Sequence, residues 1–526
     1  MRSRTSPPSP ADVGGYDHRA VEARWRRRWA ASGSDTTPLE TAERPFYNLM
    51  MFPYPSAEGL HVGNIYAYTG ADVYGRWRRR RGDTVFQPMG FDAFGLHPEQ
   101  HAARVGEHPG SLVPRNIGHF ERQLRQLGAM FDWDHRLDTT DPAFYRWTQW
   151  LFLRLLEAGL AERRDGPALW CPSCRTVVDD WQVAHGHCER CGARVEQRSL
   201  PQWYLLTSRH AQALLDDLDE LDWPEATKKA QRDWIGRTDG AVARFELRGC
   251  PLHEIEVFTT RPDALYGMTS LLVGAEHPRH DQLVGATAVH PLTGELLPVR
   301  AAGGRPGGDP AGVAPAHDDG GMPSERAARA AVERLRRAGR GGPGVRYRLR
   351  DWLVSRRRYW GPPVPVVTCP ADGMLPVPER ELPVPLPQVE DFWPLGTGVP
   401  PLASAVDWVS TRCPRCGGPA RRDTDVLDSS LDAAWYYLRY PSSDLHDRAF
   451  DRRRTWTWLP VDSYIGGNEH AVGHLLQARF VMRALHELGL VPTPEPFRRF
   501  RAHGVILRDG AKMSKTRGNV VDPDRY

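Results

Sequence analysis

The alternation of apolar and polar residues near the start of the chain predicts a strand followed by a helix. Residues 45–71 run from an apolar stretch, through a turn rich in proline and glycine, into a helical pattern that begins near His61. This order is typical of the first strand-to-helix crossing of a nucleotide-binding α/β domain, where phosphate groups bind. We therefore expect residues 1–165 to form the first half of a doubly wound, Rossmann-like parallel sheet.

Later stretches with a helical period indicate how the chain continues. Residues 144–160 and 208–221 predict helices, so that residues 201–240 connect two modules through helical structure. Apolar residues recur on one face between 470 and 488, which predicts a long helix. We place the second half of the sheet domain in residues 346–526.

The composition changes between residues 241 and 345, which predicts a separate module inserted into the sheet domain. β-Branched residues at 255–260 favour a strand, whereas residues 301–321 hold so many glycines and prolines that we expect a loop or linker. Ser324 is positioned to cap a helix that runs to Gly339. The aromatic and basic pattern of the main domain resumes after this helix.

Composition places the chain among globular proteins of several domains. Of its 526 residues, 40% are hydrophobic and 25% are charged, which excludes a disordered or fibrous protein. The mean hydropathy is −0.53, with neither a signal peptide nor an 18-residue apolar run, so we expect a cytoplasmic protein without a membrane partner. A net charge of +4 permits a polyanionic partner without requiring one. The arginine clusters at 24–28 and 76–81 are expected to be solvated helix faces, with nucleic-acid contacts as the alternative.

Four of the eight cysteines have the spacing of a zinc site. Two C-x2-C pairs with thirteen residues between them let four thiolates converge on one ion, and the reducing cytoplasm disfavours disulfides. Four thiolates leave no coordination position for water or substrate, so the zinc of this knuckle, residues 166–200, is expected to be structural. The four candidate ligands are Cys171, Cys174, Cys188 and Cys191.

A second cysteine set, within residues 366–422, is incomplete. Cys413 and Cys416 form another pair, but the facing segment offers Cys369 and, in place of a fourth thiol, Asp372. Either these residues bind a second zinc, or they are the remains of a knuckle that no longer holds metal.

Two short motifs at opposite ends of the chain combine groups that bind phosphate. His61, Gly63 and Asn64 lie where a helix opens, so that unpaired N–H groups and the helix dipole attract an anion. Lys512 and Lys515 lie in a loop, where their ammonium groups can stabilise the charge on a departing pyrophosphate. Each motif alone is weak, because a histidine at a helix start is usually a cap and loop lysines are usually solvated.

In this order, with the second motif in a loop at 505–520, the pair resembles the signatures of class I aminoacyl-tRNA synthetases. Further segments narrow the resemblance to the leucyl-tRNA synthetases. They are MFPYPS at 51–56, DAFGL at 92–96, YRLRDW at 347–352, RYWG at 358–361 and GGNEH at 466–470. The resemblance covers nearly the whole chain. It implies a shortened synthetase, in which zinc-knuckle and reduced editing-domain insertions interrupt a Rossmann-like catalytic domain and no anticodon-binding domain follows.

The resemblance also implies roles for individual residues. The catalytic residues that handle the ATP phosphates would be His61, Asn64, Lys512 and Lys515. Further contacts to ATP would come from Gly63, Gly466, Gly467, Glu469, His470 and Met513. The amino acid would be bound by Met51, Phe52, Tyr54, Asp92, Ser430, Ala433, Tyr436 and His474, with Asp92 and the backbone at Phe52 holding its ammonium group.

The chain departs from the family pattern at the helix opening and in the amino-acid pocket. Asn64 replaces the second histidine of the first signature, a change that should leave activation intact. Ser430, Ala433 and Ala434 stand where the family usually has phenylalanine and two serines. The loss of the phenyl ring predicts a larger pocket and puts leucine in doubt as the substrate.

The editing-like module retains only part of its pattern. Thr259, Thr260 and Asp318 are its recognisable remnants, but Ala264 replaces the usual threonine and a stretch after Asp319 is missing. We expect a residual structural insertion, with proofreading hydrolysis as the alternative.

The implied reaction joins an amino acid, leucine or a related one, to ATP. The carboxylate attacks the α-phosphate, with Mg²⁺ neutralising charge, and the aminoacyl adenylate then passes its acyl group to tRNA, as in leucine–tRNA ligases. The absence of an anticodon-binding domain would weaken the contact with tRNA. Two alternatives remain: a stand-alone adenylating paralogue of altered specificity that uses a non-tRNA acceptor, and a paralogue that only binds.

Overall fold

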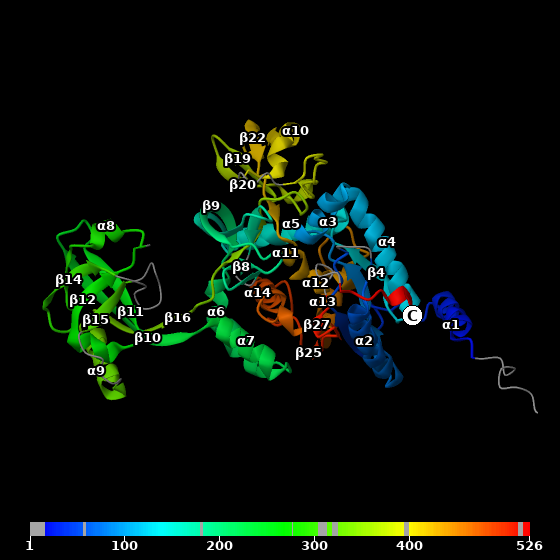
Figure 1. The fold of residues 1–526 in the computed structure, drawn as a ribbon, viewed down its shortest axis with the longest axis horizontal. Helices are drawn as coiled ribbons and strands as arrows, with labels where there is room; N and C mark the ends of the chain where they lie inside the picture. The colour runs from blue at the N-terminus through cyan, green and yellow to red at the C-terminus, as the bar shows by residue number, and fades with distance from the viewer. Residues whose placement is uncertain are drawn as a thin grey trace, which may run out of the picture. The chain divides into compact units, whose positions relative to one another are not determined.

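The computed structural model separates into two compact units, each with its own core (Figure 1). Unit 1 comprises Met1–Gln231 and Asp351–Tyr526, and unit 2 comprises Arg232–Arg350. The inserted unit therefore begins before strand β10 (Thr238–Arg248). The residues that the structure describes are 16–55, 59–178, 182–275, 277–302, 313–317, 324–393, 399–513 and 519–525.

A parallel sheet forms part of the core of unit 1. Its strand order is β2–β1–β24–β25, and every neighbouring pair is parallel. The chain passes from β1 through α2 to β2 on one side and from β24 through α14 to β25 on the other, so β1 and β24 flank a topological switch point, beside which ligands bind. The bounds are β1 Pro45–Met50, α2 Val62–Arg80, β2 Thr84–Phe86, β24 Ser463–Gly467, α14 His474–Glu487 and β25 Phe500–His503. The predicted doubly wound parallel sheet is confirmed.

Two predicted helices of unit 1 have different limits in the structure. Residues 208–221 divide into 3-10 turns on either side of a short helix, α6 (Ala211–Asp216). The helix predicted from residue 470 begins only at His474, because the backbone of Gly473 is not helical, and His470 lies in a preceding 3-10 turn. The remaining helices of unit 1 are α1 His18–Ser32, α3 Leu96–Val105, α4 Pro109–Leu127, α5 Pro142–Glu157, α10 Val406–Val409, α11 Ser429–Ala433, α12 Tyr436–Arg439 and α13 Arg452–Trp458. Helix α7, Glu225–Ile235, crosses the boundary between the units at Gln231.

The two cysteine sets lie at small antiparallel sheets of unit 1. The first sheet has the order β17–β9–β5–β6, beside the hairpin β7–β8, and the second has the order β20–β19–β22–β21. Their strands are β5 Ala161–Cys171, β6 Thr176–Val178, β7 Val183–Ala184, β8 His187–Cys188, β9 Glu196–Leu205, β17 Trp352–Leu353, β19 Val366–Cys369, β20 Gly373–Pro376, β21 Ser410–Arg412 and β22 Pro419–Arg422. Short pairs complete the unit: β3 Pro88–Phe91 with β4 Asp132–Asp138, β18 Ser355–Arg356 with β23 Val426–Leu427, and β26 Leu507–Arg508 with β27 Ala511–Lys512.

Unit 2 is built on a seven-stranded sheet that packs around an apolar core. The expectation of a continuous loop over 301–321 is wrong, because residues 313–317 form strand β15, which pairs with β12. The predicted helix cap is confirmed: the Ser324 side chain accepts a hydrogen bond from the backbone N–H of Ala327 at 3.2 Å. The elements are β11 Glu254–Thr259, β12 Met268–Val273, α8 His280–Leu283, β13 Thr287–Val289, β14 Leu296–Ala301, β15 Val313–His317, α9 Glu325–Arg337 and β16 Gly341–Arg346.

Candidate active site and cysteine clusters

The two phosphate-binding motifs, far apart in the sequence, meet at the start of α2. The N–H of Val62 donates to the carbonyl of Val521 at 3.0 Å. A Cβ added to Gly63 would lie 3.8 Å from the Cε atom of Met513, a residue of the second motif. The backbone of Lys512 belongs to β27, whereas its side chain and Lys515 lie outside what the structure describes. The fold thus joins the helix opening to the loop that carries the lysines.

His61 and Asn64 shape the helix opening itself. His61 is the N-cap residue of α2, and its N–H donates to the side-chain oxygen of Asn64 at 3.1 Å. This contact fixes the first turn, whose remaining N–H groups and dipole favour an anion. α2 therefore begins close to the carboxyl end of β1, where the switch point places a ligand.

Two glycines at the end of β24 keep the neighbouring strand end open. A Cβ added to Gly466 would lie 2.2 Å from the side chain of Met51, and one added to Gly467 would lie 2.1 Å from the Glu469 carboxylate. The N–H of Met51 also donates to the carbonyl of Ile465 at 3.2 Å. The two glycines therefore leave room for the Met51 and Glu469 side chains to pack against the end of β24.

Aromatic side chains form a wall beside this edge. Phe52 stacks on Tyr436 with ring centroids 3.8 Å apart. The hydroxyl of Tyr436 lies 2.8 Å from that of Tyr464, which lies 2.7 Å from Nε2 of His474. Burial, with a further effect of His470, lowers the pKa of His474 to about 3, so the ring is neutral. Tyr464 was not predicted from the sequence, because nothing in its strand indicates that it links two pocket residues.

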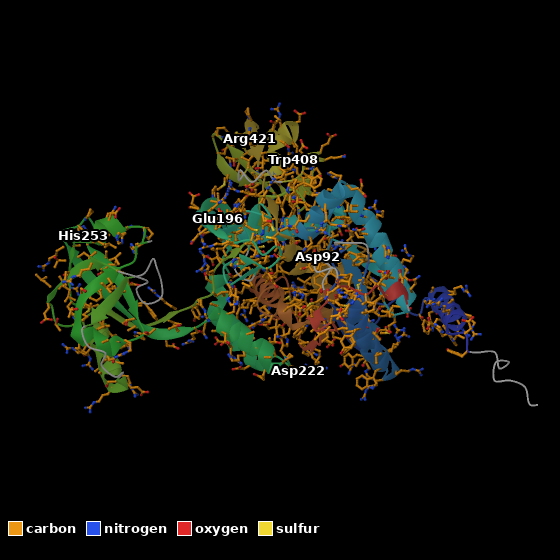
Figure 2. All side chains as sticks on the ribbon, viewed as in Figure 1. Asp92, Glu196, Asp222, His253, Trp408 and Arg421 are labelled. Atoms are coloured by element: carbon orange, nitrogen blue, oxygen red, sulfur yellow. The ribbon has the colours of Figure 1, made fainter. Side chains whose placement is uncertain are left out.

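Asp92 places a carboxylate in the interior of unit 1, where no described side chain offers it a cationic partner (Figure 2). Its backbone N–H donates to the carbonyl of Pro53 at 3.0 Å, which holds it beside Phe52. Both carboxylate oxygens are buried, and no basic side chain forms an ion pair with them within the described structure. Burial, reinforced by the Asp432 carboxylate, raises the pKa of Asp92 well above its usual range, although a hydrogen bond from the Tyr54 hydroxyl acts in the opposite direction. A buried carboxylate of this kind is set up to receive a cation.

Three other residues predicted to bind the amino acid, Ser430, Ala433 and Tyr54, differ in their burial and hydrogen bonds. The hydroxyl of Ser430 donates to Asp428 at 2.6 Å, and that carboxylate is also held by Arg356 and Arg358, at 2.6 and 2.8 Å. The Ser430 hydroxyl is therefore already engaged by the protein, while the side chain of Ala433 is buried in the main core. Tyr54, with 41% of its surface exposed, is the most open of the predicted amino-acid contacts.

Comparison with known proteins agrees with this arrangement. Profiles described as class I tRNA synthetases match residues 49–205 and 347–526, and one described as a leucyl-tRNA synthetase editing domain matches residues 232–291. A leucine–tRNA ligase from Caldanaerobacter subterraneus is 40% identical over 96% of this chain and 71% of its own length. One from Rubrobacter xylanophilus is 41% identical over 97% of this chain and 72% of its own length. The chain belongs to the leucyl-tRNA synthetase family.

A solved structure supports the same assignment. The LeuRS–tRNA–LeuAMS ternary complex from Agrobacterium radiobacter K84 superposes with a TM-score of 0.90 at 34% identity. The match covers 97% of this chain and 70% of that one, which confirms the predicted resemblance to a longer family member. No helix in the described part of this synthetase has the length and apolar character needed to cross a membrane.

The editing-like residues of this synthetase lie in unit 2. The hydroxyl of Thr259, at the end of β11, accepts a hydrogen bond from the N–H of Arg261 at 3.0 Å, and Arg261 forms an ion pair with Asp263 at 2.9 Å. Thr260 is exposed, and Asp318 lies outside the described residues. Of the described remnants, Thr259 is therefore engaged by the backbone of its own turn, while Thr260 lies at the surface.

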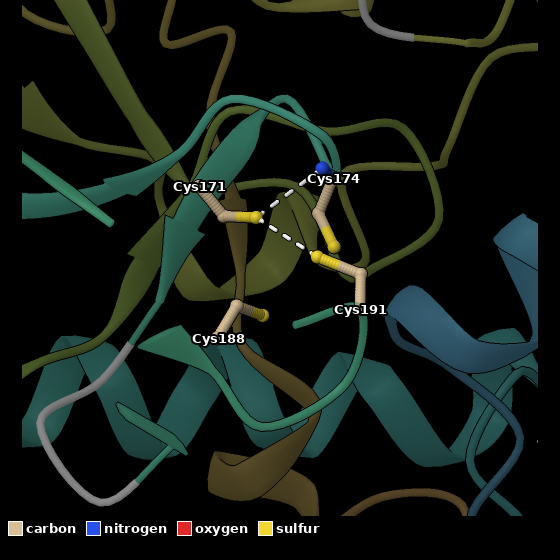
Figure 3. Close-up of side chains that lie close together, drawn as sticks. All are labelled: Cys171, Cys174, Cys188 and Cys191. Carbon is tan, nitrogen blue, oxygen red and sulfur yellow. Dashed lines mark hydrogen bonds between the residues drawn. The ribbon is translucent and has the colours of Figure 1, made fainter. Parts of the chain in front are cut away.

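The first cysteine cluster of the synthetase has the geometry of a metal site. Its four sulfur atoms lie within 4.8 Å of one another and face a common point (Figure 3). The sulfurs of Cys171 and Cys191 are 3.4 Å apart, close to the roughly 3.8 Å expected around a tetrahedral zinc. Burial raises the pKa of the Cys171 thiol to about 11, so a thiolate there needs a cation beside it. The residues fit a structural zinc ion.

The second cluster completes its set with a carboxylate. Cys369, Cys413, Cys416 and Asp372 also bring their ligand atoms within 4.8 Å of one another. The Asp372 carboxylate lies 3.2 Å from the sulfur of Cys413 and 3.5 Å from that of Cys369. Zinc accepts oxygen as well as sulfur ligands, so the substitution keeps a four-ligand set. The donor set thus favours a second metal site over a decayed knuckle.

Proposed function

We propose that this synthetase activates leucine with ATP and transfers it to tRNA, acting as a leucine–tRNA ligase in the cytoplasm. The single observation that carries the proposal is the buried carboxylate of Asp92, which has no cationic partner within the described structure and is held next to Phe52 by its backbone hydrogen bond to Pro53. An amino acid brings the ammonium group that this carboxylate lacks. Its own carboxylate is then directed towards the phosphates at the start of α2.

In the first step, an oxygen of the leucine carboxylate forms a bond to the α-phosphorus of ATP. The bond from that phosphorus to the β-phosphate oxygen breaks, and pyrophosphate leaves. Lys512 and Lys515 stabilise the charge on the leaving group, and Mg²⁺, when bound with ATP, supplies further positive charge. No side chain becomes covalently attached, so catalysis rests on positioning and electrostatics.

The pocket residues hold leucine in the orientation that this attack requires. Asp92 binds the ammonium group, while the stacked rings of Phe52 and Tyr436 and the neutral ring of His474 offer an apolar surface to the side chain. In the second step, a hydroxyl of the terminal tRNA ribose attacks the acyl carbon, and AMP leaves. The four-cysteine cluster binds a structural zinc, because its ligands leave no open position.

The decisive test is amino-acid-dependent exchange of labelled pyrophosphate into ATP over a panel of amino acids, followed by charging of a leucine tRNA. We expect exchange with leucine and its loss when Lys512 and Lys515 are replaced by alanine. Exchange with leucine but no charging would indicate an acceptor other than tRNA. Exchange only with another amino acid would contradict the proposed substrate, and none at all would contradict catalysis.

A further inference from the structure

Arginine side chains without acidic partners lie on α1 and at the C-terminal end of α2. All five are exposed, and none forms an ion pair within the described part of the chain. Neighbouring arginines differ: Arg76 is paired with Asp72 and Arg78 with Asp83. The group, named here the arginine surface, comprises Arg24, Arg27, Arg28, Arg80 and Arg81.

Tryptophan rings hold parts of this surface in place. The guanidinium of Arg28 lies 5.2 Å from the ring centroid of Trp25, and that of Arg81 lies 4.8 Å from the ring of Trp77. These rings remain 39% and 47% exposed. A stacked guanidinium keeps its N–H groups free for an oxyanion and loses little side-chain entropy on binding one.

A further stacked pair connects the two helices. Arg76 lies 4.9 Å from the ring of Trp29, so α1 contacts the C-terminal half of α2. No residue of α1 is buried, so this helix presents its arginines without contributing to the core. The helix dipole explains arginines in the last turn of α2 but not Arg24 and Arg27, which lie in the middle of α1.

We propose that the arginine surface binds the sugar–phosphate backbone of RNA, at a contact separate from the active site. Guanidinium groups fit phosphate oxygens in pairs, and a run of them matches the regular charge of an RNA strand. α2 has 19 residues and so separates the two sites by about 27 Å, because His61 caps one end and Arg80 ends the other. The inference rests on the proposed function in that tRNA is the RNA this synthetase uses.

Fluorescence anisotropy with a labelled leucine tRNA and a labelled 12-base-pair RNA duplex tests the proposal over a range of salt concentrations. For the full chain we expect affinity to fall steeply with salt. The variant R24A/R27A/R80A/R81A should reduce the slope of log affinity against log salt by about one for each arginine and weaken binding at least tenfold. The matched control is R329A/R337A on α9, where both arginines are exposed but paired with glutamates on the same helix, and it should change affinity less than twofold.

Leucine-dependent pyrophosphate exchange separates this proposal from the proposed function. The four-arginine variant should keep full exchange, since activation needs no RNA. Loss of RNA binding with intact exchange supports the arginine surface, whereas absent exchange in the unaltered protein contradicts only the proposed function. Unchanged RNA binding by the variant, a nearly flat salt dependence of the unaltered chain, or equal competition by a polyglutamate peptide would each overturn the RNA contact.

Discussion

Unit 1 buries carboxylates that lack a cationic partner. In unit 2, the carboxylates whose pKa values are shifted lie at the surface beside arginines. In unit 1, burial raises the pKa values of Asp92 and Asp432 well above their usual range. Among the described residues of unit 2, Asp239 and Asp263 instead have lowered pKa values, because Arg237 and Arg261 donate hydrogen bonds to them. Exposed pairs of this kind contribute little to stability.

The difference shows that the buried carboxylates without a cationic partner, which are electrostatically unfavourable, lie in unit 1. A buried, unpaired carboxylate destabilises the folded protein unless a ligand supplies the opposite charge, and such groups gather at functional sites. Unit 1 therefore has the pattern of a working site. The described part of unit 2 shows no such buried, unpaired carboxylate, so we still expect it to act as a structural insertion.

The largest effect is expected from D92N. Asparagine keeps the shape of the side chain but cannot balance a buried ammonium group, a change that costs about 2–5 kcal/mol. We expect kcat/KM for leucine in pyrophosphate exchange to fall about 10²- to 10³-fold. D239N on unit 2 is the matched control and should leave exchange unchanged. A fall of less than fivefold for D92N would place the ammonium group elsewhere.

Glu99 offers a test of buried charge in unit 1 that is independent of substrate. Burial raises the pKa of this carboxyl to about 7, although the N–H groups of Tyr359 and Trp360 donate to it. Between the ordinary value of 4.5 and pH 7 the unfolded chain releases this proton while the folded chain keeps it. The free energy of unfolding therefore falls as pH rises through this window, by about 3 kcal/mol in total.

E99Q should remove this pH dependence, because glutamine stays neutral. Urea unfolding at several pH values between 4.5 and 8 measures the effect, and the variant should be the more stable protein at pH 8. Parallel pH curves for the variant and the unaltered chain would show that Glu99 does not titrate in this range. D239N, which alters an exposed carboxylate of lowered pKa, should leave the curve unchanged over the same range.

The second cysteine cluster allows a test with a smaller expected effect, in which the substitution strengthens a site instead of removing a charge. D372C restores a fourth thiolate, a softer ligand for zinc than a carboxylate, so zinc should leave the protein about tenfold more slowly in the presence of a chelator. Release is followed with a zinc-sensitive dye, and C188S, which should lose the zinc of the first cluster alone, assigns the two signals. Equal rates for D372C and the unaltered chain would argue that Asp372 is not a ligand.

The smallest effect is expected in unit 2. T260A alters an exposed residue of the editing-like strand, and we expect it to change neither leucine charging nor the yield of isoleucyl-tRNA by more than twofold. Thin-layer analysis of charged tRNA measures both products. A rise of fivefold or more in isoleucyl-tRNA would show that unit 2 still proofreads, and the contrast between the units would no longer hold.

Sequence-based prediction succeeded where the cause is local. The Ser324 cap, the strand and helix around His61 and the paired cysteines each depend on residues a few positions apart. It failed over residues 313–317, where the cause is distant. Strand β15 forms within a glycine- and proline-rich segment because β12 supplies its hydrogen-bond partners.

The sequence by itself determined the family, the order of the modules and the identity of the signature residues, because these depend on residue types and spacing alone. Only the tertiary structure decided that Val62 meets Val521, that Phe52 stacks on Tyr436 and that Asp92 is buried without a described cationic partner. Burial and partner choice are properties of segments far apart in the chain. Whether a carboxylate is solvated, paired with a cation or buried without one is therefore settled only when those segments pack together.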